Sequence, residues 1–190
     1  MDFPDDPLWD FSLAVYGREG VPAACLALQE HHGVDVNLML FALWAGSAGL
    51  APLGPGAMER VMTAVAPLHL DVVRPLRQAR RALKTVETGL DPALVATLRK
   101  QVARAELDAE HAEQLALSRL AGDLPTAPEG DRAAAAGDNL ACYLDIAAPA
   151  RDGTDAAALE TLFRAAFPGV TAEQTALLMQ RRHGHDPSVT

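Results

Sequence analysis

The stretch from Asp35 to Ser47, DVNLMLFALWAGS, carries apolar or small side chains on every side of a helix, apart from Asp35 and Asn37. A helix that is hydrophobic all round lies inside a protein core or a membrane. The stretch is shorter than the roughly 20 residues that a membrane span requires. We therefore expect it to be the central buried helix of an all-α protein, with the other helices packed around it.

The composition agrees with a compact all-α bundle. The chain is 49% hydrophobic and only 5% aromatic, and its apolar residues are mostly Ala and Leu, which favour helices. Its 190 residues suffice for one domain that needs no disulfide or metal for stability. Cys25 and Cys142 lie far apart in apolar sequence, which is typical of reduced core residues. Residues 1–10 are acidic and do not resemble a secretory signal, so we expect a cytoplasmic protein.

Composition shifts divide the chain into four parts. A helical core domain is expected over residues 8–121, and the sequence GDLPTAPEGDRAAAAG at 122–137 is typical of a linker or mobile loop. Shorter helical stretches over 138–182 predict a small C-terminal appendage. Residues 183–190 predict a frayed tail.

The best-patterned amphipathic segment covers residues 68–87, although Pro75 must kink or divide it. Its polar side forms a basic stripe of Arg74, Arg77, Arg80, Arg81 and Lys84. The phosphates of RNA, an acidic protein or a lipid headgroup would each suit this stripe. The net charge of −9 nevertheless disfavours nucleic acid as a partner of the whole protein.

Asp91 and Pro92 open a long helix that is expected to end near Leu120, and it carries an acidic row of Glu106, Glu110 and Glu113. If this helix and the segment 68–87 form an antiparallel pair, the acidic row faces the basic stripe. We favour this pairing over a di-iron site, because the chain contains no Glu-x-x-His motif. We predict no metal site, no cofactor and no membrane span.

The densest polar cluster lies where a helix over 22–32 meets the central helix. Gly33 and Asp35 are explained as helix caps, and histidines suit the negative end of a helix. The alternative interpretation is a small-molecule pocket at this corner, lined by Gln29, His32, Asn37 and Trp44. Capping leaves Gln29 and Asn37 without a role.

Two linked patterns, WxFSLxxYxxxGVxxACLxLQxxxGxDVNxxLFxLW and VVxPLRxxRRxLK, occur within the stretch from about Leu8 to Leu120. In these patterns the chain resembles a proteobacterial family of small proteins that is known only as a domain of unknown function. The resemblance implies a helical cytoplasmic protein and no established activity. The positions that fall on the patterns are Trp9, Tyr16, Gln29, Gly33, Asp35, Asn37, Trp44, Arg74, Pro75 and Arg77.

The sequence therefore favours a non-enzymatic helical protein that binds another protein or a second copy of itself. The partner surface is expected on the first helix or on the basic stripe, through Trp9, Tyr16, Arg74, Arg77, Arg81 and Lys84. The runner-up is a small-molecule-binding protein or enzyme that uses the corner pocket. Contact of the basic stripe with RNA or the ribosome is a weaker alternative.

Overall fold

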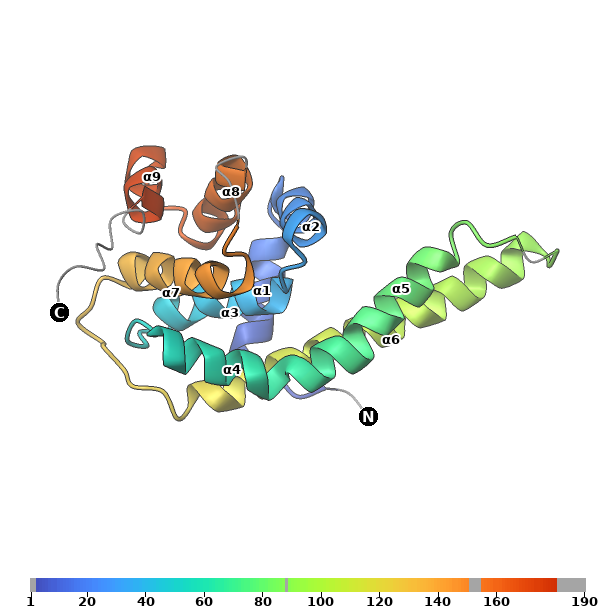
Figure 1. The fold of residues 1–190 in the computed structure, drawn as a ribbon, viewed down its shortest axis with the longest axis horizontal. Coiled ribbons are helices and arrows are strands. Elements are labelled where there is room, and N and C mark those ends of the chain that lie inside the picture. The colour runs from blue at the N-terminus through green and yellow to red at the C-terminus, as the bar shows by residue number, and fades with distance from the viewer. Residues whose placement is uncertain (1–2, 88, 151–154, 181–190) are drawn as a thin grey trace.

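The computed structural model describes residues 3–87, 89–150 and 155–180, and every element assigned within them is a helix (Figure 1). The all-α bundle is thus confirmed. Residues 183–190, expected to fray, lie outside the described residues. The helices are α1 (Pro7–Tyr16), α2 (Val21–His32), α3 (Val36–Ser47), α4 (Pro55–Leu68), the π-helix η1 (His69–Val73), α5 (Arg74–Ala82), α6 (Pro92–Ala121), α7 (Arg132–Ala147), α8 (Ala156–Ala166) and α9 (Ala172–Gln180).

Helix α3 is the central helix of the bundle. The Asp35 side chain caps it by accepting a hydrogen bond from the Asn37 backbone N–H at 2.9 Å. Its apolar residues are buried almost without exception, and Phe41 and Leu43 are completely inaccessible to solvent. The continuous apolar surface that the sequence predicted is therefore covered on all sides by other helices.

The C-terminal helices belong to the same core. Helix α7 packs along α3, and α8 packs on α2 (Figure 1). Tyr143 of α7 and Phe163 of α8 are buried together with the side chains of α3. Helix α7 begins at Arg132, where Asp131 caps it, so the connection predicted at 122–137 is too long. The small residues at its start are helical because they face the bundle.

A single rod runs from α4 through η1 into α5. Pro67 lies inside α4 and does not end it. Pro75 is accommodated as expected of a dividing residue, because the chain widens into a π-turn just before it. The Arg74 N–H reaches back five residues to the His69 carbonyl, which shifts the register of the following residues.

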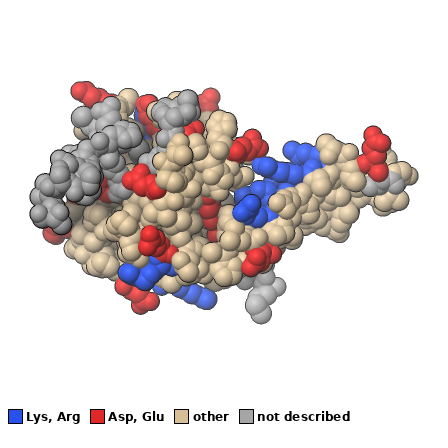
Figure 2. Space-filling view, in the orientation of Figure 1, with Lys and Arg blue, Asp and Glu red and all other residues tan. Residues whose placement is uncertain are grey.

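Helix α5 and the first half of α6 form an antiparallel pair that projects from the bundle as an arm (Figure 1). Figure 2 shows Lys and Arg side chains gathered on the part of the arm nearest the bundle. The second half of α6 enters the bundle, where Leu117 is buried. None of the described helices combines the length and apolar composition that crossing a membrane requires.

Candidate functional site

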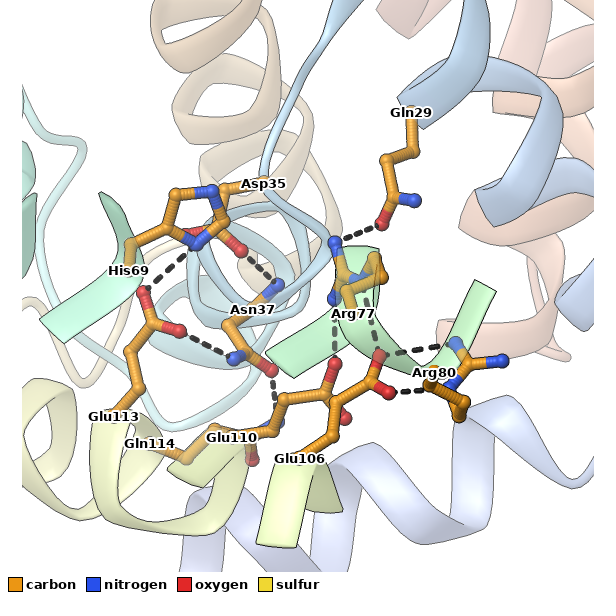
Figure 3. Close-up of polar contacts among 10 residues, drawn as sticks. All are labelled: Gln29, Asp35, Asn37, His69, Arg77, Arg80, Glu106, Glu110, Glu113 and Gln114. Atoms are coloured by element: carbon orange, nitrogen blue, oxygen red, sulfur yellow. Dashed lines mark hydrogen bonds and ion pairs between the residues drawn. The ribbon is translucent and has the colours of Figure 1, made fainter. Parts of the chain in front are cut away.

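The base of the arm carries a dense polar network between the α2–α3 corner, the rod and α6 (Figure 3). Each of these elements contributes to it: Gln29 from α2, Asp35 and Asn37 from the start of α3, His69 from η1, Arg77 and Arg80 from α5, and Glu106, Glu110, Glu113 and Gln114 from α6. The antiparallel pairing of basic and acidic helices that the sequence predicted places these side chains together.

Arg77 is the centre of the outer half of the network. Its Nε donates to Glu106 Oε1 at 3.1 Å, its Nη1 to Gln29 Oε1 at 2.6 Å and its Nη2 to Glu110 Oε1 at 2.5 Å. Arg80 adds two further hydrogen bonds to the Glu106 carboxylate. The planar guanidinium of Arg77 thus joins α2, α5 and α6 in one set of charge-assisted hydrogen bonds.

The two glutamates of this outer half differ in their ionisation. Burial raises the pKa of Glu106, but the hydrogen bonds from Arg80 and Arg77 outweigh burial and hold that pKa below its usual range. For Glu110, burial is not fully offset by Arg77, and the nearby Glu106 charge also opposes ionisation, so its pKa is raised. Arg77 therefore contacts two carboxylates whose pKa values are shifted in opposite directions.

Asn37 is the centre of the inner half. Its Nδ2 donates to Glu113 Oε2 at 2.8 Å, and its Oδ1 accepts from Gln114 Nε2 at 2.8 Å. Glu113 is completely buried, and Gln114 is nearly so. Asn37 thus fixes two consecutive residues of α6 against the first turn of α3, a role that helix capping does not require.

Beyond Asn37, three ionisable groups meet. His69 Nδ1 lies 2.8 Å from Asp35 Oδ2 and 3.5 Å from Glu113 Oε1. Burial opposes protonation of His69, but the two carboxylates outweigh it and raise its pKa to about 9. Burial also raises the pKa of Glu113 to about 7, whereas His69 and Glu113 together hold the pKa of Asp35 below its usual range despite burial. The set of one imidazole and two carboxylates is also a possible cation ligand set.

These shifts predict that the stability of the metal-free protein falls as pH rises from about 5 to 9. The native state retains protons on Glu113 between 4.5 and about 7, and on His69 between 6.5 and about 9, whereas the unfolded chain has released them. Stability is therefore highest at the acidic end and is lost through both intervals. We expect a loss of about 2 kcal/mol, measured by urea unfolding at a series of pH values with a chelator present.

The variant His69→Gln provides the comparison for this pH dependence. It removes the imidazole, so the loss of stability that His69 contributes between 6.5 and about 9 should disappear, and only a loss from Glu113, whose pKa His69 no longer lowers, should remain. Stability of the unaltered protein that is constant or rises between pH 5 and 9 would contradict the predicted proton retention.

A cavity of about 240 Å³ lies beside the network, between α1, α2, α3, α5 and α6. Its apolar side includes Trp9, Leu13, Leu26, Leu40 and Leu107. Its polar side is the network itself, represented by Gln29, Asn37, Arg77, Arg80, Arg81, Glu106, Glu110 and Gln114. Ser12 and Gln114 also line this cavity, and the Oγ of Ser12 and the Oε1 of Gln114 are buried without a hydrogen-bond partner among the described residues.

Of the four residues predicted for a corner pocket, Gln29 and Asn37 line this cavity. His32 does not line it; its Nε2 contacts the buried Asp155 at the start of α8. Trp44 also lies elsewhere, partly buried against the core, with its ring 6.1 Å from that of Phe41. The corner between α2 and α3 thus forms only part of the cavity, which is also lined by α1, α5 and α6.

The predicted partner surfaces are partly occupied within the chain. Trp9 and Tyr16 line the cavity, and the Trp9 ring stacks on His111 at 4.0 Å between centroids. In the basic stripe, Arg77 is buried in the network, whereas Arg81 makes an exposed ion pair with Glu30. Arg74 and Lys84 are exposed at the surface.

Sequence reasoning missed His69 and Gln114. His69 is a single histidine in an apolar segment, LHLDVV, and nothing in its neighbours signals that it meets Asp35 and Glu113. Gln114 follows the acidic row directly, and its bond to Asn37 depends on the packing of α6 against α3. A useful signal was present in Asn37 itself, because a polar residue at the third position of an apolar helix needs a buried partner.

The chain belongs to DUF2390, a protein family of unknown function, whose family model matches residues 7–117. This match covers α1 to α5 and α6 as far as residue 117, and therefore every residue of the network and all sides of the cavity. No curated protein and no solved structure shows significant similarity to the chain.

Proposed function

We propose that this protein binds a small organic acid in the cavity at the base of the arm. The observation that carries the proposal is the combination of an apolar wall with buried polar atoms that lack partners. Ser12 and Gln114 line the cavity, and Ser12 Oγ and Gln114 Oε1 are buried without a hydrogen-bond partner among the described residues. Leaving such atoms unsatisfied costs about 1–3 kcal/mol each, a cost that a hydrogen-bonding ligand offsets. A concave site with few convergent polar groups is typical of small-molecule binding.

The ligand chemistry follows from the charges around the cavity. Arg80 uses two N–H donors on Glu106, and a guanidinium has five. Arg81 bonds Glu30 through Nη2 only, among the contacts of the described residues. Both arginines border the cavity and therefore retain donors for an acidic group. The indole of Trp9 and the leucines opposite suit an aromatic or aliphatic body.

Binding of small aromatic carboxylates tests this proposal. We expect indole-3-acetate and phenylacetate to bind one site per chain, observed by ligand-detected NMR and calorimetry. Phenethylamine has a similar body with the opposite charge, so the arginines should repel it. Equal binding of the acids and the amine, or no binding of the acids, would contradict the proposed ligand class.

Two matched tryptophan variants locate the site. Leu107 is half-exposed at the rim of the cavity, so Leu107→Trp should fill the cavity and abolish binding while leaving the fold intact. Leu98 is similarly exposed on the same helix but lies on the arm, so Leu98→Trp should bind the acids normally. Binding that survives Leu107→Trp would place the ligand elsewhere.

A second candidate function, self-association through the arm, is favoured by exposed apolar residues. Leu94 and Leu98 are one helical turn apart on α6, and their exposed fractions are 62% and 48%. Val86, at the end of the arm, is also half-exposed. We favour a second copy of the chain as the partner, because an apolar stripe on a projecting helix is complementary to itself across a two-fold axis.

Sedimentation analysis tests self-association. The double variant Leu94→Glu/Leu98→Glu should be monomeric at concentrations where the unaltered chain is dimeric. Leu70→Glu introduces the same type of charge at an exposed leucine outside the arm, so it should leave the dimer unchanged. A monomeric unaltered chain at high concentration would exclude this function.

We assign no nucleic-acid role to the basic stripe, because Arg77 and Arg80 are paired with glutamates.

A further inference from the structure

Three ligand-type atoms converge beside the start of α3: Asp35 Oδ2, His69 Nδ1 and Glu113 Oε1 (Figure 3). These side chains offer donor atoms that all lie within 4.8 Å of one another, and His69 Nδ1 is 2.8 Å and 3.5 Å from the two oxygens. Atoms that hold one ion at roughly 2.0–2.2 Å lie roughly 3–3.5 Å apart. We propose that Asp35, His69 and Glu113 bind a divalent transition-metal ion.

The three atoms have unsatisfied bonding capacity. Each is inaccessible to solvent, and none makes a hydrogen bond of normal geometry with another described residue. They are close enough for ion pairs, but their contacts fall outside the geometry of a normal hydrogen bond. An ion placed between them would satisfy all three atoms at once. This second observation is independent of the distances.

Asn37 holds the two carboxylates in the orientation that a metal site requires. Asp35 Oδ1 accepts from the Asn37 backbone N–H at 2.9 Å, and Glu113 Oε2 accepts from the Asn37 side chain at 2.8 Å. Each carboxylate therefore uses one oxygen on Asn37 and turns the other toward His69. Hydrogen-bond partners outside the ligand set orient metal ligands in this way.

A cavity that is open to the surface adjoins the cluster. Asp35 and His69 border an open cavity of about 290 Å³, whose other walls include Met62 and Tyr143. Three protein ligands beside an open cavity leave coordination positions for water or a ligand, as in catalytic rather than structural sites. His69 is the first residue of the π-helix, an element that is frequent at functional sites.

The donor set identifies the class of ion. One imidazole nitrogen and two carboxylate oxygens suit Zn²⁺, Fe²⁺ or Mn²⁺, whereas Mg²⁺ and Ca²⁺ prefer oxygen ligands alone and Cu⁺ prefers sulfur. With His69 neutral, a divalent ion balances the charges of Asp35 and Glu113. The ion would thereby remove the repulsion between two buried carboxylates.

Cobalt binding to the full chain tests the site. We expect chelator-treated protein to take up one Co²⁺ per chain, seen by calorimetry and visible absorption, and to release it to Zn²⁺. Glu113→Gln keeps the shape of the side chain but removes its charge, and His69→Gln removes the nitrogen ligand. Each should weaken Co²⁺ binding by more than the roughly 10–100-fold that a change outside the ligand set costs.

Four of the five other histidines provide the controls. The double variants His31→Gln/His32→Gln and His183→Gln/His185→Gln should bind Co²⁺ as the unaltered chain does. In the unaltered Co²⁺ protein, paramagnetically shifted NMR signals should come from one imidazole only, a result that does not depend on the folding of any variant. Failure to take up stoichiometric Co²⁺ or Zn²⁺, uptake that survives His69→Gln, or signals from two imidazoles would overturn the proposal.

Discussion

Replacing Gly46 with alanine is expected to destabilise the protein by about 3 kcal/mol, near the upper end for the addition of one methyl group. Helix α3 approaches α7 so closely here that a Cβ at Gly46 would lie 2.3 Å from the Ala136 backbone nitrogen and 2.6 Å from its Cα. Backbone atoms cannot rotate away, so the two helices must separate. Alanine's better helix propensity returns only about 1 kcal/mol. Urea unfolding measures the difference.

Two further variants define this contact. Gly56 lies in α4, and a Cβ there meets nothing closer than the end of the Arg60 side chain at 3.8 Å, so Gly56→Ala should be neutral or stabilising. Ala136→Gly combined with Gly46→Ala should restore stability only in part, because the shortest contacts are with the backbone of residue 136. A Gly46→Ala protein as stable as Gly56→Ala would show that α3 and α7 are not packed this closely.

This contact also explains why the sequence did not predict the role of α7. The residues AAAAG before Asp138 are small, a composition that is typical of linkers. They are small because the distance between packed helices depends on the side chains at their contact, and α7 lies directly against Gly46. The burial of α3, by contrast, could be predicted from the sequence, because a helix that is apolar on all sides must be covered whichever helices cover it.

The candidate site was predictable only where it follows local patterns. The spacing of Arg77, Glu106 and Glu110 predicted that α5 and α6 would pair through their charges, and the ion pairs confirm this. Gln29 and Asn37 were recognised as polar residues that capping does not explain. Their partners could not be identified, because Arg77 and Glu113 lie 48 and 76 residues away in the sequence and meet them only through tertiary packing.

Replacing Arg77 with alanine is expected to destabilise the protein by about 3 kcal/mol. The Arg77 side chain is 14% exposed, and it bonds Glu106 and Glu110, whose side chains are 6% and 25% exposed. Arg80 still neutralises Glu106 in the variant, but Glu110 and the amide of Gln29 lose their partner. The stability of Arg77→Lys should lie between that of the unaltered protein and that of Arg77→Ala, because an ammonium cannot replace the three hydrogen bonds that the planar guanidinium makes. Urea unfolding again measures the loss.

Arg104→Ala is the matched control, because Arg104 pairs with Asp108 on the exposed surface of α6 and should contribute less than about 0.5 kcal/mol. The cost of Arg77→Ala arises from a carboxylate left buried without its cation, rather than from a large net gain of the ion pair. Arg77→Leu combined with Glu110→Leu should therefore be more stable than Arg77→Ala alone. If Arg77→Ala costs no more than Arg104→Ala, the network does not hold the arm to the bundle, and the polar side of the proposed ligand cavity has no fixed support.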